Sequence, residues 1–176
     1  MFISSQDADT GMTDFDASQI NIRPATPPDL QRIGKLGAAL VRMHHDLDSK
    51  RFIAATPQTE HGYGSFLGTQ LDNPKVVVLV AEEGGQILGY TYAGVEGRDY
   101  MSLRGPAGIL YDIIVDPAQR GRGVGRKLLN ATIAELERRG VSQVVLSTAE
   151  RNAAAQRLFD AAGFRRTMIE MTRDLK

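Results

Sequence analysis

The chain has 176 residues, a usual length for one folded unit, and we expect a single domain over residues 19–176. Its 21 Lys and Arg residues balance its 21 Asp and Glu residues, so net charge gives no broad attraction to nucleic acid or to an anionic membrane. The absence of cysteine excludes a disulfide framework, a thiolate metal site and a cysteine nucleophile. We therefore expect no nucleic acid, no membrane and no metal among its partners.

The first 18 residues are polar and acidic, and they lack the basic start and the apolar run of a signal peptide. We expect them to form a mobile tail. The longest apolar runs, such as residues 76–81, are far shorter than the roughly 20 residues that a membrane-spanning helix needs. These features predict a cytoplasmic protein.

Apolar spacing predicts the elements of the first half of the chain. Residues 20–24 alternate apolar and polar side chains before a proline, which indicates an edge strand. A helix-start signal at 27–29 and apolar residues at helical spacing predict a helix over 29–43. After a polar, irregular stretch, residues 66–71 indicate a second helix.

The β-branched run 75–82 and the returning run 87–95 flank a glycine turn and predict an antiparallel hairpin. Residues 109–115 have the composition of a strand, which Asp116 and Pro117 end. A helix follows over about 126–139, with Gly140 as its left-handed terminator.

The last quarter of the chain predicts a short buried strand over 141–146, a helix over 152–162 that Gly163 ends, and a last strand over 164–172. The element order describes a mixed α/β domain. Its β-α-β unit is expected to be parallel and right-handed.

The segment from 109 to 129 places a strand, a glycine-rich loop and a helix in that order. Main-chain N–H groups of such a loop and of the helix N-terminus can point together at an anion. Glycines let the main chain approach a phosphate closely and adopt positive φ. The loop contains three glycines and three arginines: Gly121, Gly123, Gly125, Arg120, Arg122 and Arg126.

Generic phosphate motifs fit this loop poorly. The dinucleotide fingerprint requires a third glycine where this chain has Arg126 or Leu128, and the Gly-Lys-Ser/Thr end of a nucleotide P-loop is absent. NAD and ATP are therefore disfavoured as ligands.

The run Arg120-Gly-Arg-Gly-Val-Gly125 resembles the cofactor signature of the GNAT superfamily of acyl-CoA-dependent N-acyltransferases, Gln/Arg-x-x-Gly-x-Gly/Ala. The family also commonly shows Asn-x-x-Ala-x-x-Leu-Tyr and then Gly-Phe, which Asn152 to Phe159 and the pair 163–164 resemble. The resemblance implies acetyl-CoA as the acyl donor. It also implies a GNAT-like fold, in which helices flank a central, mostly antiparallel mixed sheet with splayed parallel strands.

The resemblance further implies which residues bind the cofactor. The strand residues would hydrogen-bond the pantetheine arm as if it were an added strand, and a main-chain N–H there would polarise the thioester carbonyl. The loop amides would grip the pyrophosphate, and the asparagine would approach from the far side. The positions are Ile113, Ile114, Val115, Arg120, Gly121, Arg122, Gly123, Val124, Gly125, Arg126 and Asn152.

The implied reaction is direct attack by a primary amine on the thioester within a ternary complex. Because an amine with a pKa of about 10.4 is mostly protonated near neutrality, a base is needed. Relatives often carry Glu or Asp on the strand before the loop, where this chain has Tyr111 and Asp112. Both are candidate catalytic residues, although strand alternation puts them on opposite faces unless the strand bulges. Alternatively, Tyr111 packs and Asp112 binds the neighbouring loop.

Phe159 occupies the position where many relatives use a tyrosine to protonate the leaving thiolate. A phenyl ring has no proton to give. Either a water or another hydroxyl, such as Ser147 or Tyr92, replaces it, or the chain is a catalytically silent acyl-CoA-binding module or sensor.

The acceptor is not readable from the sequence, and small amines, amino acids, antibiotics and peptide α-amines all stay open. An acidic pocket would favour polyamines. His44 and His45, expected just after the first helix, are candidates for a base or a substrate contact, and surface or packing roles are the alternative. With Asp46 and Asp48 they are too crowded to share one metal ion. Many relatives pair through C-terminal strands, which implies a homodimer.

Overall fold

The computed structural model describes residues 19–175, and the tail expected over residues 1–18 lies outside them. The strands are β1 (Asn21–Pro24), β2 (Val76–Glu83), β3 (Gln86–Glu96), β4 (Ala107–Val115) and β5 (Val144–Leu146). The α-helices are α1 (Leu30–Leu47), α2 (Thr59–Gly68), α3 (Val124–Arg138) and α4 (Ala153–Ala161), with short 3-10 turns η2 (Pro27–Asp29) and η3 (Pro117–Gln119). No helix within residues 19–175 is long and apolar enough to cross a membrane.

The five strands form one sheet in the order β1-β2-β3-β4-β5. All neighbouring strands are antiparallel except β4 and β5, which run parallel over the three pairs from Gly108–Val144 to Leu110–Leu146. Because β5 ends at Leu146, residues 111–115 of β4 continue without β5 beside them. The expected mixed sheet with a parallel splay is therefore confirmed.

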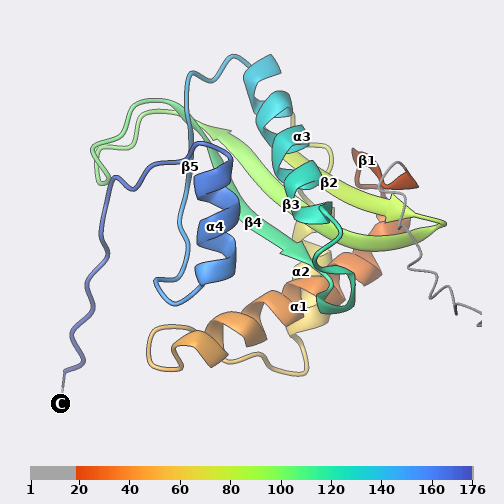
Figure 1. Ribbon diagram of the computed structural model, residues 1–176, viewed down its shortest axis with the longest axis horizontal. Helices are drawn as coiled ribbons and strands as arrows, with labels where there is room; N and C mark the ends of the chain where they lie inside the picture. The colour runs from red at the N-terminus through yellow and green to blue at the C-terminus, as the bar shows by residue number, and fades with distance from the viewer. Residues whose placement is uncertain (1–18, 176) are drawn as a thin grey trace, which may run out of the picture.

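Helices cover both faces of the sheet, so the domain has three layers (Figure 1). Along β2, Val77, Leu79 and Ala81 pack in one apolar cluster with residues of α3 and α4. The alternate residues Val78 and Val80 pack in a second cluster with α1 and α2. The period-2 alternation of a strand thus supplies both halves of the core.

Three predicted elements have different bounds in the structure. Helix α2 covers Thr59–Gly68, whereas residues 66–71 were expected. Helix α1 continues to Leu47, so His44 and His45 lie in its last turn and not after it. No glycine or proline lies between Met43, where the helix was expected to end, and the extended Asp48. Strand β5 has three residues and is half-buried, whereas a longer, buried strand was expected.

The predicted last strand over residues 164–172 is wrong, because these residues form no strand. A strand needs a neighbour for its main-chain groups, and apolar alternation does not supply one. Glu170 in this segment and Asp174 just after it instead form ion pairs with Arg51 and Lys50 in the loop after α1. Phe164 packs against the core, whereas the later apolar side chains Met168, Ile169 and Met171 are exposed.

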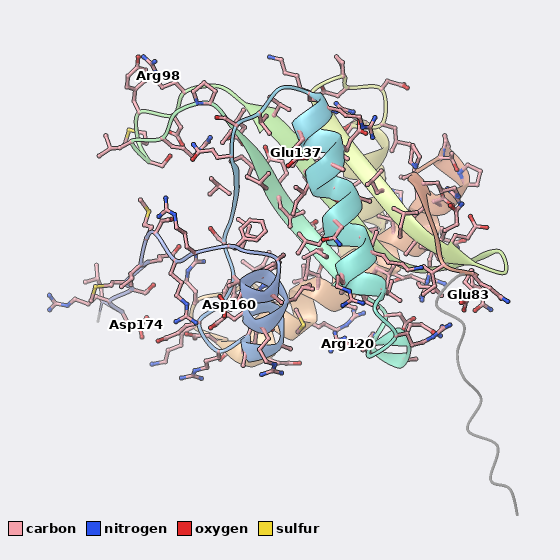
Figure 2. The ribbon with its side chains drawn as sticks, turned by 45° about the horizontal axis from the view of Figure 1, so that its top comes forward. Glu83, Arg98, Arg120, Glu137, Asp160 and Asp174 are labelled. Atoms are coloured by element: carbon pink, nitrogen blue, oxygen red, sulfur yellow. The ribbon has the colours of Figure 1, made fainter. Side chains whose placement is uncertain are left out.

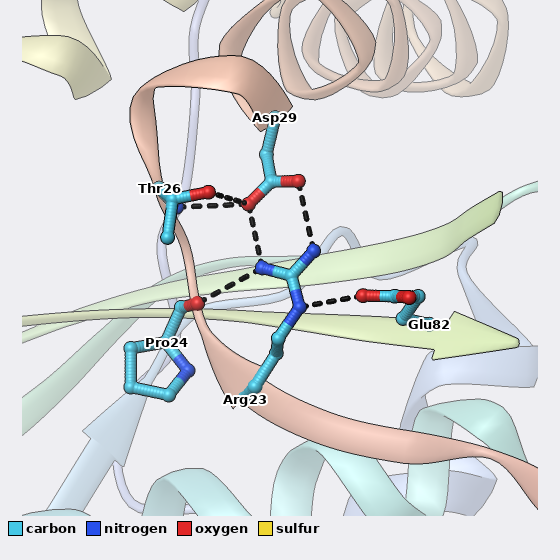
Figure 3. Close-up of polar contacts among 5 residues, drawn as sticks. All are labelled: Arg23, Pro24, Thr26, Asp29 and Glu82. Atoms are coloured by element: carbon cyan, nitrogen blue, oxygen red, sulfur yellow. Dashed lines mark hydrogen bonds and ion pairs between the residues drawn. The ribbon is translucent and has the colours of Figure 1, made fainter. Parts of the chain in front are cut away.

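A charged network joins the edge strand β1 to the start of α1 (Figure 3). Arg23 donates two hydrogen bonds to the Asp29 carboxylate, at 2.7 and 3.0 Å, and a third to Glu82 on β2. The main-chain N–H and the hydroxyl of Thr26 also donate to Asp29, each at 2.8 Å. Asp29 is buried, so these bonds compensate for its desolvation.

This network predicts a pH-dependent part of the stability. The hydrogen bonds from Arg23, followed by those from Thr26, lower the pKa of Asp29 from 3.8 to about 2, despite burial. The contribution to the free energy of unfolding, about 2 kcal/mol at most, is complete above pH 4 and is lost as the pH falls through about 2. Asp29→Asn should remove this increment in urea unfolding measured from pH 6 to pH 2. The exposed Asp72→Asn is the control, and an equal loss there would contradict the assignment.

Candidate active site

The glycine-rich loop links η3 to α3 at the end of β4. Gly121 and Gly123 have φ of +81° and +78°, a region that other residues enter only with strain. Gly123 is the N-cap of α3, so the main chain turns there directly into the helix. No heavy atom lies within 4 Å of where a Cβ would stand at either glycine. The loop therefore presents an open main-chain surface beside the first N–H groups of α3.

The loop arginines take different positions. Arg120 is exposed near the start of α3 (Figure 2), with its guanidinium 3.8 Å from the sulfur of Met43. Arg122 instead donates to Gln119 at 2.6 Å and to Glu83 at 2.8 Å, which ties the loop to the β2–β3 hairpin. The expected contribution of the Arg122 charge is thus largely neutralised by Glu83. Arg126 lies in the first turn of α3.

A β-bulge interrupts the alternation of β4 at the site. Tyr92 of β3 pairs with Asp112, while the next residue, Ala93, pairs with Leu110. Tyr111 is therefore an extra residue in β4 with no partner of its own on β3. Both Tyr111 and Asp112 line the same cavity, which regular alternation would have prevented.

This cavity lies where β4 and β5 part, and its volume is about 290 Å³. Helices α1, α2 and α4, the loop after α1 and both parallel strands contribute to it. The lining residues are Leu40, Val41, Met43, His44, Phe52, Ile53, Tyr63, Leu110, Tyr111, Asp112, Ile113, Leu146, Ser147, Thr148, Asn152, Ala155 and Phe159.

Asp112 is the carboxylate of this cavity. The hydroxyl of the buried Tyr90 donates to its Oδ2 at 3.1 Å. Burial raises the pKa of Asp112, and the Tyr90 hydrogen bond and the nearby His44 offset this only in part. A carboxyl group with a raised pKa accepts a proton more readily, which suits a general base.

Tyr111 is held differently. Its hydroxyl donates to Glu96 at 2.5 Å, and Glu96 also accepts from Arg104 at 2.6 Å. Its ring stacks on Tyr92, with centroids 4.7 Å apart. Desolvation and then the Glu96 hydrogen bond raise the pKa of Tyr111 far above neutrality, so its proton stays on. This arrangement fits a packing role better than a basic one.

The two histidines of α1, His44 and His45, lie in different surroundings. The ring of His44 lies in the cavity wall, and its Nδ1 donates to the Leu40 carbonyl at 2.9 Å, which leaves Nε2 as the acceptor in the neutral ring. His45 binds the Phe52 carbonyl at 2.9 Å and lines a neighbouring hollow. Within residues 19–175, no group of three or more His, Asp or Glu residues is arranged to hold a metal ion.

Helix α4 contributes two of the expected positions. Asn152 is its N-cap, and the side-chain oxygen accepts from the Ala155 N–H at 3.2 Å, so its Nδ2 group is the part that can reach a ligand. Phe159 is buried in the cavity wall, with its ring centroid 5.9 Å from that of Phe164. Of the two replacement hydroxyls expected, Ser147 lines the cavity, whereas Tyr92 stacks on Tyr111 outside its wall.

Tyr63 lines the cavity but was not predicted as a site residue. Its ring lies against α1 at Gly37, where a Cβ would stand 2.3 Å from the tyrosine Cδ1. Burial raises the pKa of Tyr63 to about 12, so it is a hydrogen-bond donor at neutral pH. A glycine in the middle of a predicted helix was the available signal, because it marks a close approach by another element.

An opened parallel strand pair, an open glycine loop at a helix N-terminus and a carboxylate-bearing cavity at the opening are the features of an acyl-CoA-dependent transferase. The model of the acetyltransferase (GNAT) family matches residues 41–164, and the chain belongs to this family.

The chain is 40% identical over 97 residues to a mycothiol acetyltransferase of Thermobispora bispora, covering 53% of this chain and 31% of that protein. It is 38% identical over 87 residues to the L-methionine sulfoximine/L-methionine sulfone acetyltransferase of Salmonella typhimurium, covering 49% of each. The chain thus spans half or less of these relatives. The fold matches that of a predicted acetyltransferase from Clostridium acetobutylicum solved with acetyl-CoA, with a TM-score of 0.64, 19% identity, and coverage of 87% of this chain and 96% of that one.

Proposed function

We propose that the protein transfers an acetyl group from acetyl-CoA to a primary amine by direct attack in a ternary complex. The observation that carries this proposal is the position of Asp112, a carboxylate with a raised pKa in a cavity at the point where β4 leaves β5. An amine and a thioester that meet there would have a base beside them and a strand edge along them.

The residues present fit acetyl-CoA. Because β5 ends at Leu146, the edge of β4 from Ile113 to Val115 is available to hydrogen-bond the pantetheine arm. The amides from Arg120 to Arg126 would hold the pyrophosphate, with Gly121 and Gly123 in the positive-φ geometry that an anion nest needs. Asn152 would donate from the opposite wall through Nδ2. When bound, acetyl-CoA supplies an acyl carbon activated by its thioester.

In the proposed reaction an N–C bond forms, the C–S bond breaks and the amine loses a proton. Asp112 would hold the ammonium and accept this proton, directly or through a water. The coenzyme thiolate departs with the electron pair of the broken bond. Since a thiol has a pKa of about 8.5, the thiolate can leave without an acid, and Ser147 or Thr148 in the cavity wall can donate a hydrogen bond to it.

Thiol release with an amine panel tests the proposal. We expect acetyl-CoA to bind in calorimetry and coenzyme A to be released in an acceptor-dependent manner. The second candidate, a silent acyl-CoA-binding module, is favoured by Phe159, which presents a ring without a hydroxyl to the cavity. Binding without acceptor-dependent release for any amine would establish that candidate instead. Competition by ATP as strong as that by coenzyme A would overturn both.

A further inference from the structure

The two halves of the cavity differ in the side chains that line them. One half, on β4, β5 and α4, contains the strand edge and Asn152 that we assign to acetyl-CoA. The other half, called the amine half here, is formed by α1, the loop after it and α2. Its wall consists of Leu40, Val41, Met43, His44, Phe52, Ile53 and Tyr63. Apart from the His44 ring and the Tyr63 hydroxyl, these side chains are apolar.

The cavity also contains few charged side chains. Among the described residues that line it, Asp112 is the one carboxylate, and none is Lys or Arg. The other titratable groups facing Asp112 are His44 from α1, Tyr63 from α2, and Tyr90 and Tyr92 from β3. Arg120 contacts Met43 from the glycine loop but is exposed beyond the wall, and Glu96 is occupied by Arg104 and Tyr111.

These side chains restrict the charges that an acceptor molecule can carry in the amine half. A substrate carboxylate in the amine half would have no Lys or Arg side chain in the wall as its counterion and would lie near Asp112, and a second ammonium would have no second carboxylate there. A single ammonium, in contrast, has Asp112 as its counterion. The cavity volume of about 290 Å³ is at the small end for ligand sites, so the acceptor must be compact.

We propose that the acceptor is a compact primary monoamine with an apolar or aromatic body and no carboxylate. This proposal rests on the proposed acetyl transfer and specifies its substrate class. It excludes α-amino acids and polyamines as preferred acceptors. An acidic pocket, which would favour polyamines, is not formed by the described lining residues.

Matched pairs of amines test the substrate class. In the first pair, 2-phenylethylamine and L-phenylalanine differ by a carboxylate, and in the second, butylamine and 1,4-diaminobutane differ by a second ammonium. With values of kcat/KM corrected to the free-base fraction, we expect 2-phenylethylamine to exceed L-phenylalanine by at least about 100-fold. Butylamine should exceed the diamine by at least about tenfold.

A second test of the substrate class adds a positive charge to the amine half. Ile53 lines the cavity and is 78% exposed, so Ile53→Arg should fold normally. We expect it to raise the ratio of kcat/KM for L-phenylalanine to that for 2-phenylethylamine by about tenfold or more. The uncharged Ile53→Gln is the matched control and should leave this ratio unchanged.

The outcomes separate this proposal from the proposed function. Efficient transfer to L-phenylalanine or to 1,4-diaminobutane by the unaltered protein would overturn the substrate class while confirming acetyl transfer. Transfer to no amine at all, with acetyl-CoA bound, would overturn both. If Ile53→Arg and Ile53→Gln change the ratio of kcat/KM for L-phenylalanine to that for 2-phenylethylamine equally, charge in the amine half does not select the acceptor.

Discussion

Asp112→Asn lowers kcat/KM for acetyl transfer by about 10²- to 10⁴-fold, which is the usual contribution of a general base, while the Kd for acetyl-CoA stays unchanged. The substitution preserves the shape of the side chain, and an amide oxygen can still accept the hydrogen bond from Tyr90. The loss should therefore appear in transfer and not in folding. Steady-state thiol release and a thermal melt of the same samples measure the two effects.

Two further variants test this expectation. Asp160→Asn changes an exposed carboxylate on α4, labelled in Figure 2, and should leave transfer unaltered. Tyr111→Phe removes a hydroxyl whose proton is held by Glu96 and should cost far less than Asp112→Asn. The reverse ranking, a large loss in Tyr111→Phe with near-normal transfer in Asp112→Asn, would assign the base to Tyr111.

The pH dependence of kcat/KM tests the role of Asp112 independently. Asp112 must be ionised to accept a proton, so kcat/KM should rise as the pH increases through its raised pKa. The Tyr90 hydrogen bond favours the ionised form and lowers that pKa. Tyr90→Phe should therefore shift the acidic limb of the profile to higher pH. A limb that stays in place would show that another group controls it.

Gly123→Val weakens the binding of acetyl-CoA by about tenfold or more, because charge-assisted hydrogen bonds from the loop amides depend on the main-chain geometry at this residue. Gly123 has a φ of +78°, and a β-branched side chain there costs about 1–2 kcal/mol unless the loop rearranges. Either response disturbs the start of α3. Calorimetry with acetyl-CoA measures the binding, and a urea melt measures the stability.

Gly140→Val is the matched control. Gly140 follows the other end of α3 with a φ of +81°, and a Cβ there would have no heavy atom within 4 Å. Both variants should therefore lose similar stability, whereas only Gly123→Val should lose affinity for acetyl-CoA. Equal affinity in the two variants would refute the placement of the pyrophosphate on the glycine loop.

Local sequence was sufficient for the elements whose signals lie close together in the chain. The hairpin of β2 and β3 was predicted because two β-branched runs flank Gly84 and Gly85. The junction of β4, the glycine loop and α3 was predicted because its turn residues and its apolar spacing are contiguous. The helix predicted over 152–162, which the structure shows as α4, and its terminator Gly163 belong to the same class.

Partners distant in the chain decided the rest. The run 164–172 alternates like a strand but has no neighbouring strand to pair with. The pairing of Arg122 with Glu83, 39 residues away, redirects a charge that the motif alone would assign to an anion.

The sequence by itself determined most of the elements and the glycine-rich turn before α3, because these depend on local propensity and on glycine conformation. The tertiary structure decided which side chains meet at the cavity. The bulge at Tyr111 depends on the register between β3 and β4, and Tyr63 reaches the cavity through the contact of α2 with Gly37. Register and helix packing are set by long-range contacts, and no local pattern encodes them.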